Sequence, residues 1–163
     1  MRTQAFALEH GAKVWDRGAV MEPAYDWHIS TKVRVSADKR RVFNALIEPE
    51  YLELWVRLPS QDQAGHIVAS RARNLFRFDY IQSGNLALTV LGSYRYCSQR
   101  GISFDWWNTS CNSVSSCVEI HLERCRECSI LSLTHRGIFE KKEYLWQKEM
   151  WEGSLARLQG LFS

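Results

Sequence analysis

His135 is the residue whose type and position make it the best single candidate for chemistry. It follows Leu131 and Leu133 at two-residue steps, so in a strand the three side chains share one face. That face is apolar, which predicts a buried imidazole. Such a group can act as an acid, a base or a hydrogen-bond donor to a ligand. It can equally be a structural histidine with protein partners, and the sequence leaves both interpretations open.

Large aromatic side chains form the second candidate group. Those predicted to point inward would line a cavity for an apolar or aromatic ligand. Core packing alone would explain the same set, because cavity walls in such a fold are also core residues. The candidate cavity lining consists of Trp55, Phe76, Phe78, Tyr80, Phe104, Trp106, His135, Tyr144 and Trp151.

The cysteines are the third group with possible chemistry. The five of them are Cys97, Cys111, Cys117, Cys125 and Cys128, an odd count whose spacing fits no disulfide framework. Cys125 and Cys128 form a C-x-x-C motif in a predicted hairpin turn, where no helix N-terminus lowers a thiol pKa. A zinc site would need a second pair of suitable spacing. We therefore predict no metal and no cofactor, and the motifs assign no catalytic residue.

The elements that position these residues follow from periodicity. Alternation of apolar and polar residues predicts a half-buried strand over residues 29–35. Ser36 is placed to cap a first short helix, and Pro49 suits the start of a second one that runs through Trp55. Residues 60–65 are predicted to form a loop.

From about residue 67 to 135 one strand follows another. Short polar segments separate the strands, with turns at 83–85 and 124–127 and a longer loop over 108–116. Consecutive strands joined by short turns form an antiparallel meander. Each strand has one apolar face, so the sheet must cover another element.

The last segment, residues 141–162, is predicted to be that covering helix. It lacks proline and would be roughly 30 Å long. Its apolar residues recur at steps of four, three and four, at Trp151, Leu155, Leu158 and Phe162. Gly153 and Gly160 weaken a helix interior, and we expect them to mark a close approach to the sheet.

This order of elements predicts an α+β fold. A curved antiparallel sheet of six or seven strands would wrap around the long C-terminal helix, with two short helices after the first strand. Residues 28–163 would form the domain and residues 1–27 an N-terminal arm, partly ordered. Aromatic residues of the arm could contact the domain or a second copy of the chain in a homodimer. A space enclosed by sheet and helix is a common place for ligands.

Composition excludes several classes of protein. The 163 residues suit one domain, and 21 Lys and Arg against 18 Asp and Glu give a net charge of +3. That excess is too small and too scattered to indicate a nucleic-acid partner. No stretch approaches the roughly 20 apolar residues that span a bilayer. Residues 1–20 lack the apolar core of a secretory signal, so we expect a cytoplasmic protein with free thiols.

Three stretches resemble one family, the bacterial homologues of the heat-shock protein 90 ATPase activator in the START-like (SRPBCC) superfamily. They are VSADKRRVFNAL at 35–46, followed by EPEYL and Trp55; LTHRGI at 133–138; and WEGSLARL at 151–158. The resemblance implies the helix-grip fold. For the wider superfamily it implies binding of hydrophobic small molecules, with some members acting as cyclases or hydrolases.

Three functions therefore remain as hypotheses. The first is binding of a hydrophobic small molecule in the cavity between sheet and helix, with no chemistry assigned. The second is a cyclase- or hydrolase-type enzyme that uses His135 with a nearby hydroxyl such as Tyr144. The third is a chaperone ATPase cofactor or interaction module, which would require an exposed apolar patch on the outer surface.

Overall fold

The computed structural model describes residues 26–59, 65–110 and 115–163. Almost all of the predicted arm, and most of the predicted 60–65 loop, lie outside these ranges. The described strands are β1 (Trp27–Val35), β2 (Gly65–Ala72), β3 (Leu75–Gln82), β4 (Asn85–Ser98), β5 (Gly101–Asn108), β6 (Ser116–Cys125) and β7 (Cys128–Ile138). The described helices are α1 (Lys39–Ile47), α2 (Pro49–Trp55) and α3 (Lys141–Gly160).

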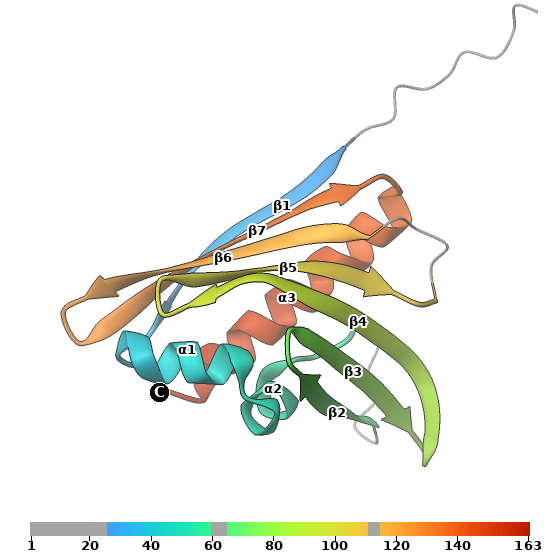
Figure 1. Ribbon diagram of the computed structural model, residues 1–163, viewed down its shortest axis with the longest axis horizontal. Helices are drawn as coiled ribbons and strands as arrows, with labels where there is room; N and C mark the ends of the chain where they lie inside the picture. The colour runs from blue at the N-terminus through green and yellow to red at the C-terminus, as the bar shows by residue number, and fades with distance from the viewer. Residues whose placement is uncertain (1–25, 60–64, 111–114) are drawn as a thin grey trace, which may run out of the picture.

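The strands form one antiparallel sheet in the order β1-β7-β6-β5-β4-β3-β2. Every neighbouring pair except β1 and β7 is consecutive in the chain, as a meander requires. Figure 1 shows the sheet curving around α3, with α1 and α2 packed near the C-terminal end of that helix. The predicted α+β architecture is therefore confirmed. No described helix is long and apolar enough to cross a membrane.

The first helix begins later than the sequence analysis predicted. Asp38, and not Ser36, is the N-cap, and its carboxylate accepts hydrogen bonds from the backbone N–H groups of Arg40 and Arg41 at 2.9 and 3.0 Å. The backbone N–H of Ala37 donates to the carbonyl of Val35 at 2.8 Å, so a tight turn separates strand and helix. The turn places Asp38 at the capping position.

Polar side chains fasten α3 to the rest of the domain. The Ser154 hydroxyl accepts from the backbone N–H of Arg57 at 2.8 Å and donates to its carbonyl at 3.1 Å. The Gln159 amide donates to the carbonyl of Arg34 in β1 at 2.9 Å. These bonds hold both the segment after α2 and the first strand against the helix.

The two glycines of α3 do not mark a close approach to the sheet, and that prediction is wrong. A β-carbon on Gly153 would lie 3.8 Å from the Arg57 side chain, an ordinary contact outside the sheet, and one on Gly160 would face open space. The helix approaches the sheet instead through the large buried side chains Trp151, Leu155 and Leu158.

Candidate functional site

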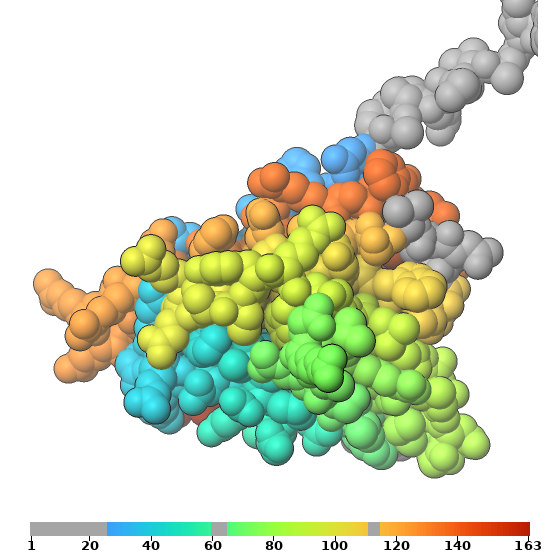
Figure 2. Space-filling view, in the orientation of Figure 1, coloured from blue at the N-terminus to red at the C-terminus, as the bar shows by residue number. Residues whose placement is uncertain are grey.

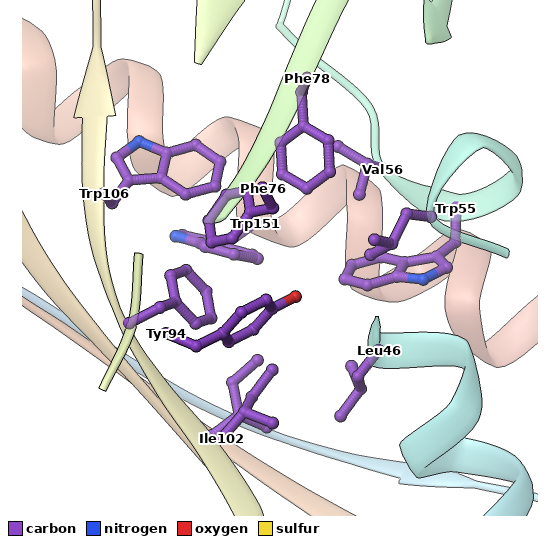
Figure 3. Close-up of a pocket in the computed structure, with 12 residues that line it drawn as sticks. Leu46, Trp55, Val56, Phe76, Phe78, Tyr94, Ile102, Trp106 and Trp151 are labelled. Carbon is purple, nitrogen blue, oxygen red and sulfur yellow. The ribbon is translucent and has the colours of Figure 1, made fainter. Parts of the chain in front are cut away.

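A small closed cavity lies between the sheet, α2 and α3. Its volume is about 20 Å³, which leaves room for about one water molecule. Figure 3 shows aromatic rings converging on it from several elements. It is lined by Leu46, Leu52, Trp55, Val56, Phe76, Phe78, Tyr94, Ile102, Phe104, Trp106, Ile120 and Trp151. Six of the nine predicted lining residues are thus brought together, around a space that is almost filled.

Ring contacts explain why the cavity is small. The Phe76 ring has its centroid 5.0 Å from that of Phe78, 5.2 Å from Tyr94 and 5.1 Å from Phe104. Trp106 lies 5.4 Å from Trp151 across the boundary between sheet and helix. These separations are those of directly packed aromatic rings, so the rings fill most of the space that they enclose.

Tyr94 is a cavity residue that the sequence analysis missed. Figure 3 shows its hydroxyl pointing toward the middle of the cavity, between Leu46 and Trp55. Burial raises the pKa of this phenol to about 12. The register of β4 against β5 shifts between Tyr94 and Tyr96, and this irregularity interrupts the alternation from which inward residues were predicted.

His135 is fully buried and both of its ring nitrogens have partners. The indole N–H of Trp151 donates to Nδ1 at 3.0 Å, and Nε2 lies 2.6 Å from the Ser116 hydroxyl. An indole nitrogen can only donate, so Nδ1 is the acceptor and Nε2 carries the proton. Ser116 then accepts from Nε2 and donates to the Trp106 carbonyl at 3.3 Å. The network is complete without a ligand.

This tautomer is the wrong one for activating the serine. A histidine that serves as base must accept the hydroxyl proton on Nε2, whereas here Nε2 donates to Ser116. Burial also lowers the pKa of His135 to about 3, so the ring is neutral at ordinary pH. The Tyr144 ring stacks on Trp27, with centroids 4.9 Å apart. Both ring nitrogens of His135 are already hydrogen-bonded, so neither is left to pair with the Tyr144 hydroxyl as the enzyme hypothesis requires.

Ser116 was missed because the predicted loop over 108–116 extended one residue too far. The structure makes Ser116 the first residue of β6 and buries it. It precedes Val118 and Ile120 at two-residue steps, so carrying the alternation back by one step would have placed it on the inward face.

A much larger hollow opens beside the closed cavity. Its volume is about 580 Å³, and it lies between the start of α3 and the ends of β3, β4 and β5. The described residues that line it are Tyr80, Ala87, Leu88, Asn108, Ser110, Glu140, Lys142, Glu143 and Trp146. Of the predicted lining residues only Tyr80 is among them. The hollow combines apolar walls with several groups that can form hydrogen bonds.

Three side chains at this end of the domain carry buried polar atoms with no partner among the described residues. They are the Tyr80 hydroxyl, the Trp106 indole nitrogen and both amide atoms of Gln147. Each of the three residues is less than a tenth exposed. A buried polar group without a partner costs roughly 1–3 kcal/mol, so such groups are rare unless something else binds them.

The C-x-x-C pair lies far from both spaces. Cys125 and Cys128 face each other across the β6–β7 turn, and this hairpin projects from the body of the molecule in orange in Figure 2. A hydrogen bond that the Cys125 thiol donates to Cys128 raises the pKa of Cys125, so the reactive thiolate form is disfavoured. In the part of the chain that the structure describes, no three His, Cys, Asp or Glu side chains are grouped to hold a metal ion.

An apolar groove runs over the outer face of the sheet. It has a volume of about 250 Å³ and is lined by Leu75, Leu91, Gly92, Ser93, Asp105, Trp107 and Ser115. Leu91 and Trp107 are register partners on neighbouring strands, and Trp107 is 48% exposed. This is the kind of outer apolar surface that the interaction-module hypothesis requires.

No family model and no curated protein matches this chain. Solved structures do match it. A protein from Chromobacterium violaceum superposes with a TM-score of 0.67 at 19% identity, over 83% of this chain and 96% of its own. The AHSA1 protein from Silicibacter pomeroyi has a TM-score of 0.68 at 15% identity, over the same shares of 83% and 96%. CalU16 from Micromonospora echinospora has a TM-score of 0.59 at 20% identity, over 86% and 79%.

At these identities the likeness establishes the fold and assigns no ligand or activity. The seven-stranded antiparallel sheet, the two short helices after β1 and the long C-terminal helix are the architecture expected from the resemblance. This chain therefore has the START-like helix-grip fold, in common with AHSA1-like structures.

Proposed function

We propose that this protein binds a hydrophobic small molecule in the space between the sheet and α3, without transforming it. The observation that carries the proposal is the hollow of about 580 Å³ at the open end of that space. Ligand pockets in proteins commonly measure roughly 300–1,000 Å³. The closed cavity of about 20 Å³ is too small for any ligand, so the hollow takes its place in the proposal.

One layer of side chains separates the two spaces. Phe78 and Trp106 line the closed cavity, with ring centroids 6.0 Å apart. Two residues further along the same strands, Tyr80 and Asn108 line the hollow. An apolar ligand in the hollow would therefore lie next to the aromatic layer, which supports binding of a flat hydrophobic molecule.

Filling the hollow tests the proposal. Leu88→Trp places a large side chain in it, and Leu75→Trp makes the same change on the outer face of the sheet. We expect the wild type and Leu75→Trp to bind methylnaphthalene with equal affinity, and Leu88→Trp to bind at least about tenfold more weakly, a loss of roughly 1.4 kcal/mol. Tryptophan fluorescence titration measures this. No binding by the wild type, or equal binding by all three, would overturn the proposal.

The interaction-module hypothesis has one observation in its favour, the apolar groove around Trp107. As a second candidate function, this groove would contact a chaperone ATPase. The test is a chaperone ATPase assay with the wild type and with Trp107→Ser. Stimulation that the substitution abolishes would support this role, and an ATPase rate unaffected by the wild type would remove it.

A further inference from the structure

Gln147 is buried where nothing in the described protein satisfies it. It is 0% exposed, and neither its amide nitrogen nor its amide oxygen has a hydrogen-bond partner among the described residues. On α3 it lies four residues from Glu143, which lines the hollow, and four from Trp151, which lines the closed cavity. Residues four apart on a helix are neighbours on one face. Gln147 lines neither space itself and lies on the helix face between a residue that lines the hollow and one that lines the closed cavity.

The Trp106 indole approaches the same region from the sheet. Its ring packs 5.4 Å from that of Trp151, the neighbour of Gln147 on the helix face. Its N–H has no partner in the part of the chain that the structure describes, although the residue is 1% exposed. Figure 3 shows the indole nitrogen on the side of the ring that faces away from Leu46 and Ile102. The donor thus points away from the closed cavity.

These groups form a complementary set. The Trp106 indole and the Gln147 Nε2 can only donate hydrogen bonds, and the Gln147 Oε1 can only accept. Two donors and one acceptor match a group that carries an acceptor oxygen beside an N–H, such as a carboxamide or a lactam. The third unpartnered group, the Tyr80 hydroxyl, lies against Gly65 at the β2 side of the hollow.

The charges around the hollow disfavour an anionic ligand. Its described lining holds Glu140 and Glu143 beside a single cation, Lys142. A ligand carboxylate placed at Gln147 would offer acceptor oxygens and no donor. It would therefore leave the Gln147 Oε1 without a donor. Burying a charge that lacks a partner is far more costly than burying a neutral amide that is hydrogen-bonded.

We propose that the hollow binds a neutral molecule with an aromatic or apolar body and a carboxamide-like head group, which Gln147 and Trp106 bind. The head-group oxygen accepts from the Trp106 indole and the Gln147 Nε2, and its N–H donates to the Gln147 Oε1. The apolar body lies in the hollow against Leu88 and Trp146. This inference rests on the proposed function and adds the chemistry of the ligand to it.

Three probes of one shape separate the head group from the body: naphthamide, naphthoate and methylnaphthalene. Calorimetry on the wild type is expected to give at least tenfold tighter binding of naphthamide than of the other two. Two or three neutral hydrogen bonds are sufficient for a change of about that size. Failure of all three probes to bind would overturn the proposed function as well. Equal binding of naphthamide and methylnaphthalene would overturn the head-group inference alone.

Gln147→Leu and Gln159→Leu make the same change at two amides of one helix. Gln159 already donates to the Arg34 carbonyl, so its loss should lower stability and leave naphthamide binding unchanged. Gln147→Leu should do the reverse. It should weaken naphthamide binding at least tenfold, leave methylnaphthalene binding within threefold, and raise the urea midpoint of the ligand-free protein, because an unpartnered buried amide is removed.

If Gln147 had only a structural role, the naphthamide affinity and the urea midpoint would change in a different way. If water satisfies the amide, Gln147→Leu lowers the urea midpoint and naphthamide still binds as to the wild type, which overturns the inference. Trp106→Phe removes the second donor and keeps an aromatic ring. It should weaken naphthamide binding and spare methylnaphthalene, and equal weakening of both probes would show that the indole N–H takes no part.

Discussion

The space between the sheet and α3 has two ends that differ in almost every respect. At one end aromatic rings close around about 20 Å³, and at the other end a hollow of about 580 Å³ remains. Both ring nitrogens of His135 beside the closed end have partners, whereas the side-chain polar atoms of Gln147 and Tyr80, and the Trp106 indole N–H between the two ends, have none among the described residues. The space between the sheet and α3 is therefore a packed core at one end and an open hollow at the other.

Side-chain size and cover explain the difference. The closed end receives large rings from β3, β4 and β5, and α1 and α2 contribute Leu46 and Trp55 to its lining. The described lining of the open end includes Ala87 and Ser110, and of the described helices only the start of α3 contributes to it. Close packing needs enough side-chain volume from all sides. The open end lacks that side-chain volume. An unfilled space is expected in a ligand-binding site, whereas in a core it would be destabilising.

Removing the wall between the two ends is the largest change that we predict. Phe78→Ala deletes a buried ring that lines the closed cavity, and we expect it to lower the free energy of unfolding by about 3–5 kcal/mol. Phe139→Ala is the matched control, because that ring is 55% exposed, and its expected effect is within about 0.5 kcal/mol. Urea denaturation measures both. Equal effects would mean that the aromatic layer is not a packed wall.

The second prediction concerns His135, beside the closed end. Its pKa is lowered by burial to about 3, from an ordinary value of 6.5. Between these values the unfolded chain binds a proton that the folded chain does not, so stability is full above pH 6.5 and falls as the pH falls toward 3. From pH 7 to pH 5 this group should remove about 2 kcal/mol.

Two histidine variants isolate this contribution. His135→Asn should show a smaller loss of stability between pH 7 and pH 5 than the wild type, by about 2 kcal/mol. His121→Asn, at an exposed position of β6, should keep the wild-type loss. An NMR titration of the wild type provides a second readout that needs no variant. An imidazole of His135 that titrates near pH 6.5 would contradict the closed, completed network.

Much of the fold could be predicted, because alternation and helical spacing are local properties of the sequence. The inward position of His135 followed from two-residue steps, and the burial of Trp151 from its place in the α3 pattern. Local patterns are weaker where two residues could serve equally. Ser36 and Asp38 are both good caps, and only the turn at Ala37 decides between them.

The site depends on information that local patterns do not hold. That Ser116 reaches His135 depends on how β6 and β7 are paired, and the inward turn of Tyr94 depends on an irregularity in β4. Gln147 lies on the buried face of α3 at a four-residue step from Trp151. A search for apolar periodicity passes over it, because its side chain is polar. The volume of a cavity is a sum over all surrounding side chains and has no local signal.

The last comparison tests the two ends through one added methyl group, and it includes the smallest effect that we predict. A β-carbon on Gly92 would overlap the ring of Phe76 at the closed end, and one on Gly65 would overlap the ring of Tyr80 at the open end. Neither glycine has a positive φ, so alanine fits both backbones. Phe76 is surrounded by other rings, and Gly92→Ala should cost about 1–3 kcal/mol of unfolding free energy.

Gly65→Ala should cost less than about 1 kcal/mol, because Tyr80 lines the hollow and its ring can turn into that space. Replacing glycine by alanine also lowers the backbone entropy of the unfolded chain. This stabilising effect is common to both variants and cancels in the comparison. Urea denaturation of the two proteins in parallel measures the difference. Equal losses would mean that Tyr80 is held as rigidly as Phe76, and the open end would then be unable to adjust its wall to a ligand.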